Sequence, residues 1–574
     1  MAISCTSALM FKKPHMLRLT TFFVALATIF CAKSVAQSGI ESEKPRLVVG
    51  IVVEQMRYDY LNRFWKQLGN NGFKRLVREG ASFENAYHNT FFTQSSSGHA
   101  SLSTGTTPSV HGIIGDRWYN DLLNKESGST DDDSKKSVGG ASYANGQMSP
   151  KNLLTTTFSD QLKLQSQLRS KVVGIALDAS SAILSTGHTA DAAYWFDDAS
   201  GSWITSSYYT SNLPEWVNTF NNRKFPSEYL KQSWNTLLSI SDYENCIQGT
   251  NNFAPGIAGK KSFPYDFEEM SKSSTRLLGN LVGTRSDLEY ALLRWSPSGN
   301  TLTKDFAIAA IEGMSMGKDE IPDFLSISFS ATENIGTAFG PSSMELMDTY
   351  LRLDRDLAHL LQFIDSAIGK ENVLIYLTSD HGTPEIPEYQ ASAKIPVGNF
   401  NYLSAVSLLK SYLNLTYGEA DWVKGYYQQQ LYLNRPLIEE RKLPLDEVQK
   451  TVARFMIQFS GVAHVMTAST LENNQFTDGI FGAMQRGFNQ KRSGDVLINL
   501  MPGWAEKGES LRSSSSPYAY DTHVPLILYG WKIAPVSIAR KVEITALAST
   551  LSSLLGVPAP DACMSQPLEE VLSR

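Results

Sequence analysis

The chain has 574 residues, of which 42% are hydrophobic and 19% charged, an ordinary composition for a globular protein with a sizeable core. This composition excludes a disordered chain and collagen, and four cysteines are too few for a disulfide scaffold. The formal net charge is −6, whereas a dedicated nucleic-acid-binding protein is usually basic, so we expect no nucleic-acid binding.

The N-terminus has the layout of a secretory signal peptide. Basic residues precede an apolar run from Leu19 to Cys31, and Ser34-Val-Ala36 supplies small residues for cleavage. The apolar run is short for a stable membrane span. We therefore predict a signal peptide over residues 1–36, cleaved near Ala36, and a periplasmic or secreted protein. A lipoprotein attached through Cys31 and a retained anchor are the alternatives.

Two cysteines remain after cleavage, Cys246 and Cys563. An extracytoplasmic compartment permits a disulfide, but nothing local pairs these two residues. One bridge and two separate buried thiols both stay open.

Five apolar, mostly β-branched runs alternate with helical stretches. Continuous runs of this kind indicate strands that are buried on both faces, and the clearest helical spacing extends over residues 344–368. The alternation predicts an α/β fold with a mostly parallel central sheet flanked by helices. Ligands of such folds bind at the carboxyl ends of the strands, where four of the runs have polar residues. The runs are Arg46–Val53, Val172–Leu177, Phe324–Phe329, Val373–Leu377 and Val524–Tyr529.

Two regions interrupt this alternation within the single domain that we expect over residues 37–574. Residues 197–299 are rich in Trp, Tyr, Phe, Asn and Ser, and we predict that they form an inserted cap segment over the site. Residues 384–490 are predicted to form a second insertion.

Candidate chemical groups follow several of the predicted strands. Residues 89–105 contain a serine cluster before Gly98-His99 that is typical of a helix start, where hydroxyls and free N–H groups can either cap the helix or bind an anion. Asp380-His381 follows one strand, and Glu54 and Glu333 end two others. Carboxylates at one sheet edge repel one another, so either a bound cation or raised carboxyl pKa values must relieve the repulsion.

Several motifs in this order resemble a known family. They include VVGIVVEQMRYDYL, SGHASLSTGTTPSVHGIIGDRWYN, GHTADAAYWFDD, LTSDHG and SPYAYDTHVPLILYG. They are similar to the phosphate-irrepressible bacterial alkaline phosphatases, members of the alkaline phosphatase superfamily beside the nucleotide pyrophosphatase/phosphodiesterases. The resemblance implies an alkaline phosphatase-like fold, two zinc ions and a Thr or Ser nucleophile that forms a phospho-enzyme.

The resemblance places the nucleophile on Ser95, where the family usually has Thr. The aspartate that ends the first strand corresponds to Glu54, and the family's Asp-His pair is unchanged as Asp380 and His381. One metal site is therefore expected from Glu54, Ser95, Asp380 and His381.

The second metal site of the family departs from its pattern. The family's Asp-x-x-x-His stretch corresponds to Glu333 and Thr337, and its last histidine corresponds to Ser514. Hydroxyls are poor neutral zinc ligands beside imidazole, so Glu333 is expected to contribute to a weaker site and Thr337 and Ser514 are the least suited ligands. The changes favour one metal, Mg²⁺, Mn²⁺ or Ca²⁺, over the two zinc ions that the family implies.

The substrate-side positions also differ from the family. Its phosphate-contacting Asn corresponds to Asp116, and its Lys-x-Arg pair corresponds to Asp178 and Ser180. Two acids near the substrate oppose a phosphate dianion. This pattern predicts a preference for diesters or other singly charged esters.

Two functions follow from this pattern. The first is a secreted, metal-dependent phosphoric-ester hydrolase of the alkaline phosphatase/phosphodiesterase type, which acts on a small phosphate ester through Ser95 and a phospho-enzyme. The alternative is a catalytically degenerate family member that has lost the bimetal centre and acts as a binding protein. A sulfatase or phosphoethanolamine transferase is disfavoured, because the chain lacks a Cys-x-Pro-Ser-Arg motif and a membrane domain. The sequence predicts no particular oligomeric state.

Overall fold

A computed structural model describes residues 44–121, 123–140, 142, 144–273, 290–506 and 515–572. The predicted signal peptide and Ser514 lie outside the described residues. Within the described part of the chain, no helix has both the length and the apolar character needed to cross a bilayer.

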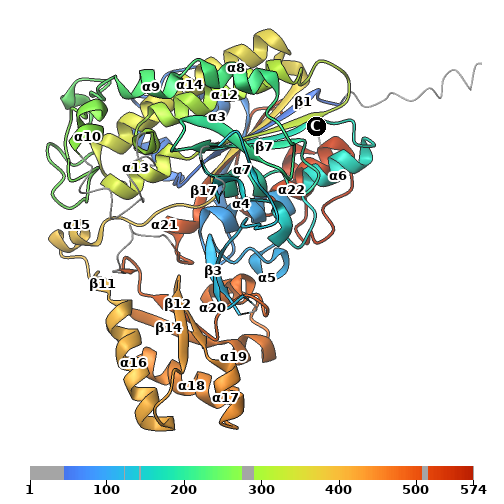
Figure 1. Cartoon of the computed structure of the whole chain (residues 1–574). Helices are drawn as coiled ribbons and strands as arrows, with labels where there is room; N and C mark the ends of the chain where they lie inside the picture. The colour runs from blue at the N-terminus through green and yellow to red at the C-terminus, as the bar shows by residue number, and fades with distance from the viewer. Residues whose placement is uncertain are drawn as a thin grey trace, which may run out of the picture. The chain divides into compact units, whose positions relative to one another are not determined.

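A mixed sheet of ten strands forms the centre of the protein (Figure 1). Its middle strands β10, β1, β9, β6 and β7 run parallel, which confirms the predicted fold class. The fifth predicted strand is also present, as β17, but it runs antiparallel to β10. In sheet order the strands are β18 (Val536–Glu543), β2 (Ala81–Tyr87), β17 (His523–Gly530), β10 (Val373–Thr378), β1 (Leu47–Val53), β9 (Asp323–Phe329), β6 (Val172–Ile175), β7 (Ala192–Asp197), β8 (Ser202–Ser206) and β5 (Ser137–Val138).

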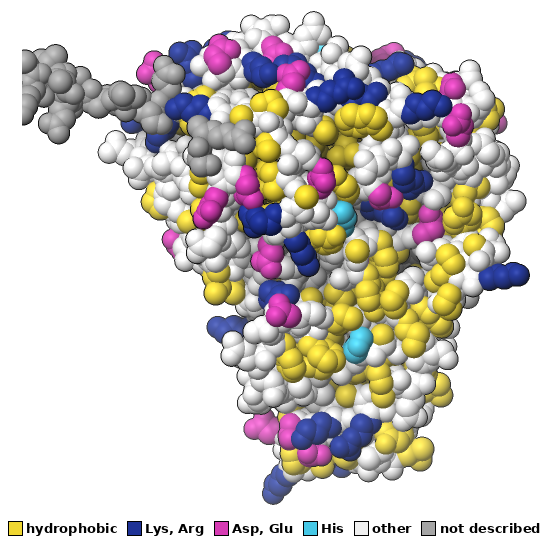
Figure 2. All heavy atoms as spheres, turned by 180° about the vertical axis from the view of Figure 1, so that it is seen from behind, with side chains coloured by type: hydrophobic (Ala, Val, Ile, Leu, Met, Phe, Trp, Pro, Cys, Tyr) yellow, Lys and Arg dark blue, Asp and Glu magenta, His cyan; other side chains and the backbone are white. Residues whose placement is uncertain are grey.

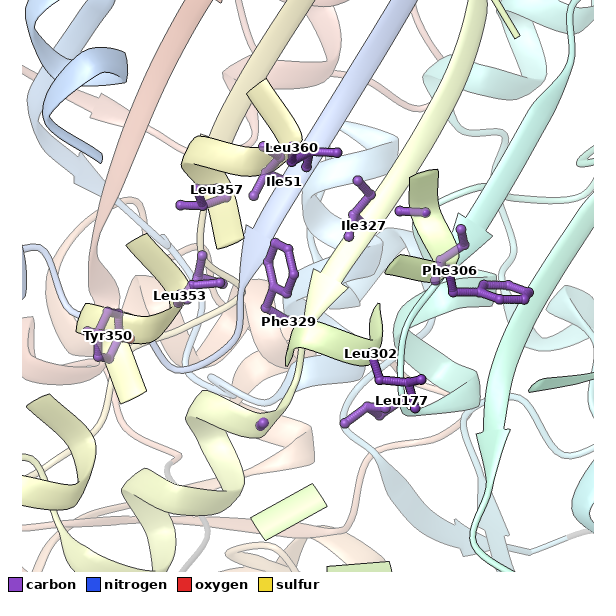
Figure 3. Close-up of a cluster of buried hydrophobic side chains, with 14 of the residues drawn as sticks. Ile51, Leu177, Leu302, Phe306, Ile327, Phe329, Tyr350, Leu353, Leu357 and Leu360 are labelled. Atoms are coloured by element: carbon purple, nitrogen blue, oxygen red, sulfur yellow. The ribbon is translucent and has the colours of Figure 1, made fainter. Parts of the chain in front are cut away.

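Helices cover both faces of this sheet, so the side chains of β1 are buried alternately on one face and the other. On the larger face, Ile51 and Phe329 pack near Leu353 and Leu357 of the long helix α14 (Figure 3). This face carries α2 (Asp59–Phe64), α3 (Phe73–Glu79), α12 (Ser298–Gly313), α13 (Ala331–Phe339) and α14 (Met344–Ala367). The opposite face carries α4 (Ser95–Thr104), α6 (Phe158–Gln165) and α22 (Ala546–Leu555).

Shorter elements connect these layers. They are α5 (Pro108–His111), β3 (Arg117–Asn120), β4 (Lys125–Gly128), η1 (Ala144–Gly146), η2 (Pro150–Asn152), α7 (Ala179–Leu184), η7 (Lys370–Asn372), α21 (Ala519–Thr522) and η8 (Glu569–Val571).

The region over residues 197–299 is built into the main core. It begins with β8, which extends the central sheet, and its Trp203 ring stacks on Phe306 of α12 at a centroid distance of 4.3 Å. Its other buried aromatic side chains join the same core cluster. The segment therefore packs against the helices of the larger sheet face. It contains α8 (Glu215–Asn222), α9 (Phe225–Leu230), η3 (Ile240–Asp242), α10 (Phe267–Ser273) and η6 (Ala291–Trp295).

The second insertion has its own sheet and core. Four antiparallel strands in the order β12-β13-β15-β14 pack against α16 and α18 (Figure 1). Because β15 belongs to this sheet, the unit continues past the expected end near residue 490. Its elements are α15 (Pro387–Ser392), β11 (Asn399–Phe400), α16 (Tyr402–Tyr417), β12 (Val423–Tyr427), β13 (Gln430–Leu433), α17 (Arg435–Glu440), α18 (Leu445–Met456), β14 (Val462–Thr467), α19 (Ala468–Asn473), α20 (Gly479–Gly487), β15 (Val496–Leu500) and β16 (Ala505–Glu506).

Cys246 and Cys563 are both free, so of the two possibilities the structure has separate thiols. Burial raises the pKa of the Cys246 thiol to about 12, which keeps it protonated and unreactive at neutral pH.

On the face that Figure 2 shows, lysine and arginine side chains are interspersed with acidic ones, and apolar side chains gather between them. This face has no continuous basic stripe of the kind that binds a polyanion.

Candidate active site

The ends of three neighbouring strands bring the candidate acids together. In the register of the central sheet, Val53 of β1 lies beside Phe329 of β9, and Val52 lies beside Thr378 of β10. The chain therefore leaves all three strands at the same edge of the sheet, where α/β proteins bind their ligands. Glu54 follows β1, Glu333 lies in the first turn of α13 after β9, and Asp380 follows β10.

Ser95 begins helix α4 and faces this edge. Its Oγ donates a hydrogen bond to Glu333 Oε2 at 3.0 Å and lies 3.3 Å from His381 Nε2. The close approach of α4 depends on Gly98, because a Cβ there would lie 2.2 Å from the Asp380 carbonyl oxygen. The glycine of the Gly-His pair thus lets Ser95 reach the acids at the strand ends.

Asp380 and His381 each direct one polar atom into the space beside Ser95 and Glu333. Asp380 Oδ1 accepts hydrogen bonds from the backbone N–H groups of Gln55 and His381, both at 2.9 Å, whereas the buried Oδ2 has no hydrogen-bond partner among the described residues. His381 Nδ1 lies 2.6 Å from the Gly382 carbonyl, which can only accept, so Nδ1 carries a proton. In the neutral ring the lone pair is therefore on Nε2, which lies 3.6 Å from Asp380 Oδ2.

Glu54 belongs to a second group of donors. Its Oε1 accepts from Ser328 Oγ at 2.7 Å and lies 3.4 Å from His99 Nε2. Ligand atoms of Glu54, His99 and Asp380 lie within 4.8 Å of one another, and so do those of Glu333, Asp380 and His381. The side chains of Glu54, His99 and Asp380 are fully buried.

This grouping differs from the expected one. The sequence placed Glu54 with Ser95 and assigned Glu333 to a weaker site, whereas in the structure Glu333 lies beside Ser95 and Glu54 lies beside His99. Sequence reasoning did not single out His99 as a ligand. The available signal was its spacing, since a residue four positions after Ser95 lies one helical turn further along the same face.

One of the two weakest predicted ligands, Thr337, has a hydrogen-bond partner beside the site. Thr337 lies one turn after Glu333 in α13, and its hydroxyl accepts a hydrogen bond from the Gln55 side chain at 3.4 Å. Ser514 lies outside the described residues. His523, which is close to Ser514 in sequence, stacks between Tyr58 and Tyr87.

The buried charges at this edge are strongly unbalanced. Burial raises the pKa of Glu333, and the neighbouring His381 only partly opposes that effect. Burial by itself would lower the pKa of His381, but Asp380 and Glu333 outweigh it and raise the pKa well above its usual value. Among the residues that the structure describes, Glu54, Glu333 and Asp380 form ion pairs with His99 and His381 and with no lysine or arginine. Three carboxylates with this little compensation favour a bound cation.

On the substrate side, both predicted acids have defined partners. Asp116 Oδ1 accepts a hydrogen bond from the backbone N–H of Ser96 at 2.9 Å. This N–H group at the start of α4 is therefore already bonded to a carboxylate rather than free to bind a phosphate. Asp178 precedes α7 and forms an ion pair of 2.7 Å with Arg294, and Ser180 lies in the first turn of the same helix. Burial raises the pKa of Asp178, while Arg294 opposes the effect.

Arg294 was not singled out from the sequence, and it changes the electrostatics at Asp178. Its Nε also bonds both oxygens of Asp198, and its Nη2 bonds the carbonyls of Leu177 and Phe196 at 3.0 Å. The guanidinium is therefore held in place by the protein, and it partly neutralises Asp178.

Two further histidines, His111 and His188, have hydrogen-bond partners outside the strand-end site. His111 Nδ1 accepts from the Ile113 N–H at 3.1 Å, and its Nε2 lies 3.0 Å from Ser101 Oγ. His188 instead lies 3.2 Å from the Asp160 carboxylate. Burial lowers the pKa of His111 to about 3, and the hydrogen bond that His188 donates to the Asp160 carboxylate raises the pKa of His188.

These opposite shifts predict opposite effects of pH on stability. Because unfolded His111 takes up a proton below about pH 6.5 and folded His111 does not, the free energy of unfolding should fall with decreasing pH, by up to about 1.4 kcal/mol per unit. His188, whose folded pKa is raised, adds stability below pH 6.5 that is lost as the pH rises. We expect His111→Gln to flatten the loss of stability between pH 6.5 and 4, and His188→Gln to reduce the loss of stability as the pH rises above 6.5, both measured by urea unfolding. A His111→Gln slope equal to the wild-type slope would contradict the assignment.

The fold and the strand-end site define an α/β protein of the alkaline phosphatase superfamily. Residues 48–518 match the family described as type I phosphodiesterase/nucleotide pyrophosphatase, and the chain belongs to this family of phosphoric-ester hydrolases.

Named relatives agree in length with this chain. Alkaline phosphatase PafA of Elizabethkingia meningoseptica is 36% identical over 92% of this chain and 95% of its own. A protein of Myroides odoratus named calcium-transporting ATPase is 36% identical over 97% and 99% of the two chains. The crystal structure of wild-type PafA superposes with a TM-score of 0.86 at 36% identity, covering 92% of this chain and 99% of PafA. The fold is therefore shared with PafA over 92% of this chain.

Proposed function

We propose that the protein is a secreted, metal-dependent phosphoric-ester hydrolase in which Ser95 is the nucleophile. The observation that carries the proposal is the convergence on one point of the Ser95 hydroxyl, a carboxylate of Glu333 and the imidazole of His381. Family membership supports the reaction class, and the predicted signal peptide supports secretion.

The residues at this point fit a divalent cation. Asp380 Oδ2 is buried without a hydrogen-bond partner among the described residues, and His381 Nε2 faces the same space, 3.6 Å from Asp380 Oδ2. Ser95, Glu333, Asp380 and His381 would hold the ion, with oxygen donors in the majority, as Mg²⁺ and Mn²⁺ prefer, and one imidazole, as Zn²⁺ accepts. The bound ion would stabilise the anionic form of the nucleophile and polarise the phosphoryl group.

The chain's own residues account for the proton and the substrate. The Ser95 hydroxyl hydrogen points to Glu333 Oε2, which would receive it as Oγ forms a bond to phosphorus and the ester oxygen leaves. Water would then attack the phosphorus and break its bond to Oγ, and Glu333 would return the proton to Ser95. The start of helix α4, where Ser95 lies, favours the negative charge of the phosphoryl group.

The direct test uses the mature protein after metal removal. Aryl phosphate mono- and diesters are assayed with Zn²⁺, Mn²⁺, Mg²⁺ or Ca²⁺ added back, beside His381→Gln and, as a matched control outside the site, His464→Gln. We expect turnover to require an added ion, to be lost in the His381 variant and to persist in the control. Turnover without an added ion, or equal rates in the His381→Gln and His464→Gln variants, would contradict the proposal.

A catalytically degenerate binding protein is the second candidate. One observation in its favour is the Thr337 hydroxyl, which bonds Gln55 instead of serving as a metal ligand. A second is the presence of Asp116 and Asp178 on the substrate side, where acids repel a phosphate. A protein of this kind would bind a phosphate ester or an ion, measurable by calorimetry, and would show no turnover with any metal.

A further inference from the structure

We infer that Gln429, at the tip of a hairpin in the second insertion, is a specificity-determining residue of a small pocket that receives the alcohol part of the ester. The pocket selects alcohols that carry a hydrogen-bond donor, either a hydroxyl or an ammonium group. The inference rests on the proposed function, because it names the class of substrate for the Ser95 site.

The pocket lies beside the candidate active site. On one side its wall includes Thr337, one turn after Glu333 in α13, and Thr383, two residues after His381. On the other side it is lined by the end of β15 and by β16 of the second insertion. Its volume of about 40 Å³ exceeds the roughly 10–15 Å³ that one water molecule needs, so it accepts a small polar group. A helical turn spans about 5.4 Å, a distance that an alcohol of a few carbon atoms bridges.

The side chain of Gln429 holds an unused acceptor in this pocket. Its Nε2 donates to the Ser515 carbonyl at 2.9 Å, and a carbonyl can only accept, so the remaining atom of the carboxamide is the oxygen. Both residues line the pocket and are only 5% exposed, and Gln429 Oε1 and Ser515 Oγ have no hydrogen-bond partner among the described residues. Buried polar atoms of this kind are costly, and a bound group that donates a hydrogen bond removes the cost.

The backbone of the hairpin tip is strained. Gln428 and Gln429 form the two-residue loop between β12 and β13, and their φ angles of 49° and 62° lie in the left-handed region. Such loops usually have the sequence Asn-Gly, so two glutamines there cost free energy, and strain of this kind gathers at binding sites. The tip also reaches the nucleophile helix, because a Cβ on Gly115 would lie 2.4 Å from Gln428 Oε1 and 2.6 Å from Oε1 of Gln94, the residue before Ser95.

The lining favours a ligand that donates hydrogen bonds. Among the described residues that line the pocket, Glu385, Glu506 and Asp521 are acidic and none is lysine or arginine. Burial raises the pKa of Glu506 to about 7, although the hydrogen bond from Tyr426 opposes that effect, so Glu506 is mostly ionised at pH 8. Trp504 lines the same pocket, and an indole ring attracts an ammonium group. Carboxylate and carboxamide oxygens therefore meet a hydroxyl or ammonium donor, whereas an ether or carbonyl oxygen would face other acceptors.

The test compares esters that differ in the donor. The mature protein with its activating metal ion is assayed with 2-aminoethyl and 2-hydroxyethyl phosphate, and with 2-methoxyethyl phosphate as the substrate without a donor. Gln429→Gly removes the carboxamide and suits the φ of 62°. We expect it to lower the ratio of kcat/KM for the donor esters to that for the methoxy ester by about tenfold, as the loss of one hydrogen bond implies. Comparing this ratio between the two proteins cancels the intrinsic reactivity of each ester.

Lys442→Gly is the matched control. Lys442 is exposed and has a similar φ of 55°, so this change relieves the same backbone conformation away from the pocket, and the ratio should stay at the wild-type value. Gln429→Asn, which tolerates the left-handed region and withdraws the oxygen by one methylene, replaces the glycine variant if that variant does not fold. The same fall in the ratio is expected.

Glu506→Gln distinguishes the two donors. It removes a charge, so it should lower kcat/KM for the aminoethyl ester alone if the pocket takes an ammonium group, and should spare both esters if the pocket takes a hydroxyl.

Inert phosphonates separate the pocket from catalysis. Calorimetry measures the binding of 2-aminoethyl-, 2-hydroxyethyl- and propylphosphonate to the wild type and to Gln429→Gly, and needs no turnover. Unchanged ester ratios together with unchanged phosphonate affinities in Gln429→Gly would overturn the inference. Ester turnover without discrimination would defeat only the pocket, whereas discrimination among the phosphonates without turnover of any ester would defeat only the proposed function.

Discussion

Ser95→Ala should abolish ester hydrolysis, with kcat lowered by a factor on the order of 10⁴ or more, as is usual when a catalytic nucleophile is removed. This change removes the Oγ atom, which donates to Glu333 and lies next to His381 Nε2. Ser95→Thr keeps the hydroxyl and should retain most of the activity. The measurement is the turnover of an aryl phosphate diester at saturating substrate.

Ser96→Ala is the matched control for this experiment. Ser96 is adjacent in α4 and fully buried, but its hydroxyl bonds Ser129 at 2.8 Å and neither Glu333 nor His381. We expect this variant to keep wild-type turnover within a few-fold. If Ser95→Ala and Ser96→Ala had equal rates, Ser95 would not be the nucleophile.

The parallel core of the fold was predictable because its strands are apolar on both faces. Runs such as Arg46–Val53 leave no polar face for solvent, and that pattern fixes both the strand and its central position. The same pattern carries no information about strand direction, so the antiparallel course of β17 was not foreseen. The sheet of β12, β13, β15 and β14 was not foreseen, because β15 pairs with strands distant in sequence.

The directions of the side chains in the site could not be predicted either. The sequence pointed to the acids of the site, since each comes shortly after an apolar run. It could not show which acid turns toward which partner, because a glutamate has several rotatable bonds and its direction depends on packing. Arg294 was missed for a related reason: it lies far from Asp178 in sequence, and only the fold places its guanidinium between Asp178 and Asp198.

Neutralising the two substrate-side acids should change the preference between monoesters and diesters. A monoester is a dianion at pH 8 and a diester a monoanion, so each nearby carboxylate penalises the monoester by one additional charge interaction, about 1 kcal/mol at 4 Å in water and more in a partly buried site. We therefore expect the double variant Asp116→Asn, Asp178→Asn to raise kcat/KM for an aryl monoester by about 10- to 100-fold relative to the diester. This factor corresponds to a change of about 1.4–2.8 kcal/mol in activation free energy.

The geometry makes this variant conservative. An asparagine at 116 can still accept the Ser96 N–H through its carbonyl, and Arg294 keeps its bonds to Asp198 when Asp178 loses its charge. When Asp178 is neutral, it no longer offsets the positive charge of Arg294. That charge then attracts the doubly charged monoester, which adds to the effect of removing the two carboxylates. Asp133→Asn serves as the control, because this exposed acid pairs only with Lys125 in the described ion pairs. An unchanged monoester-to-diester ratio in the double variant would mean that these acids lie too far from the substrate to select it.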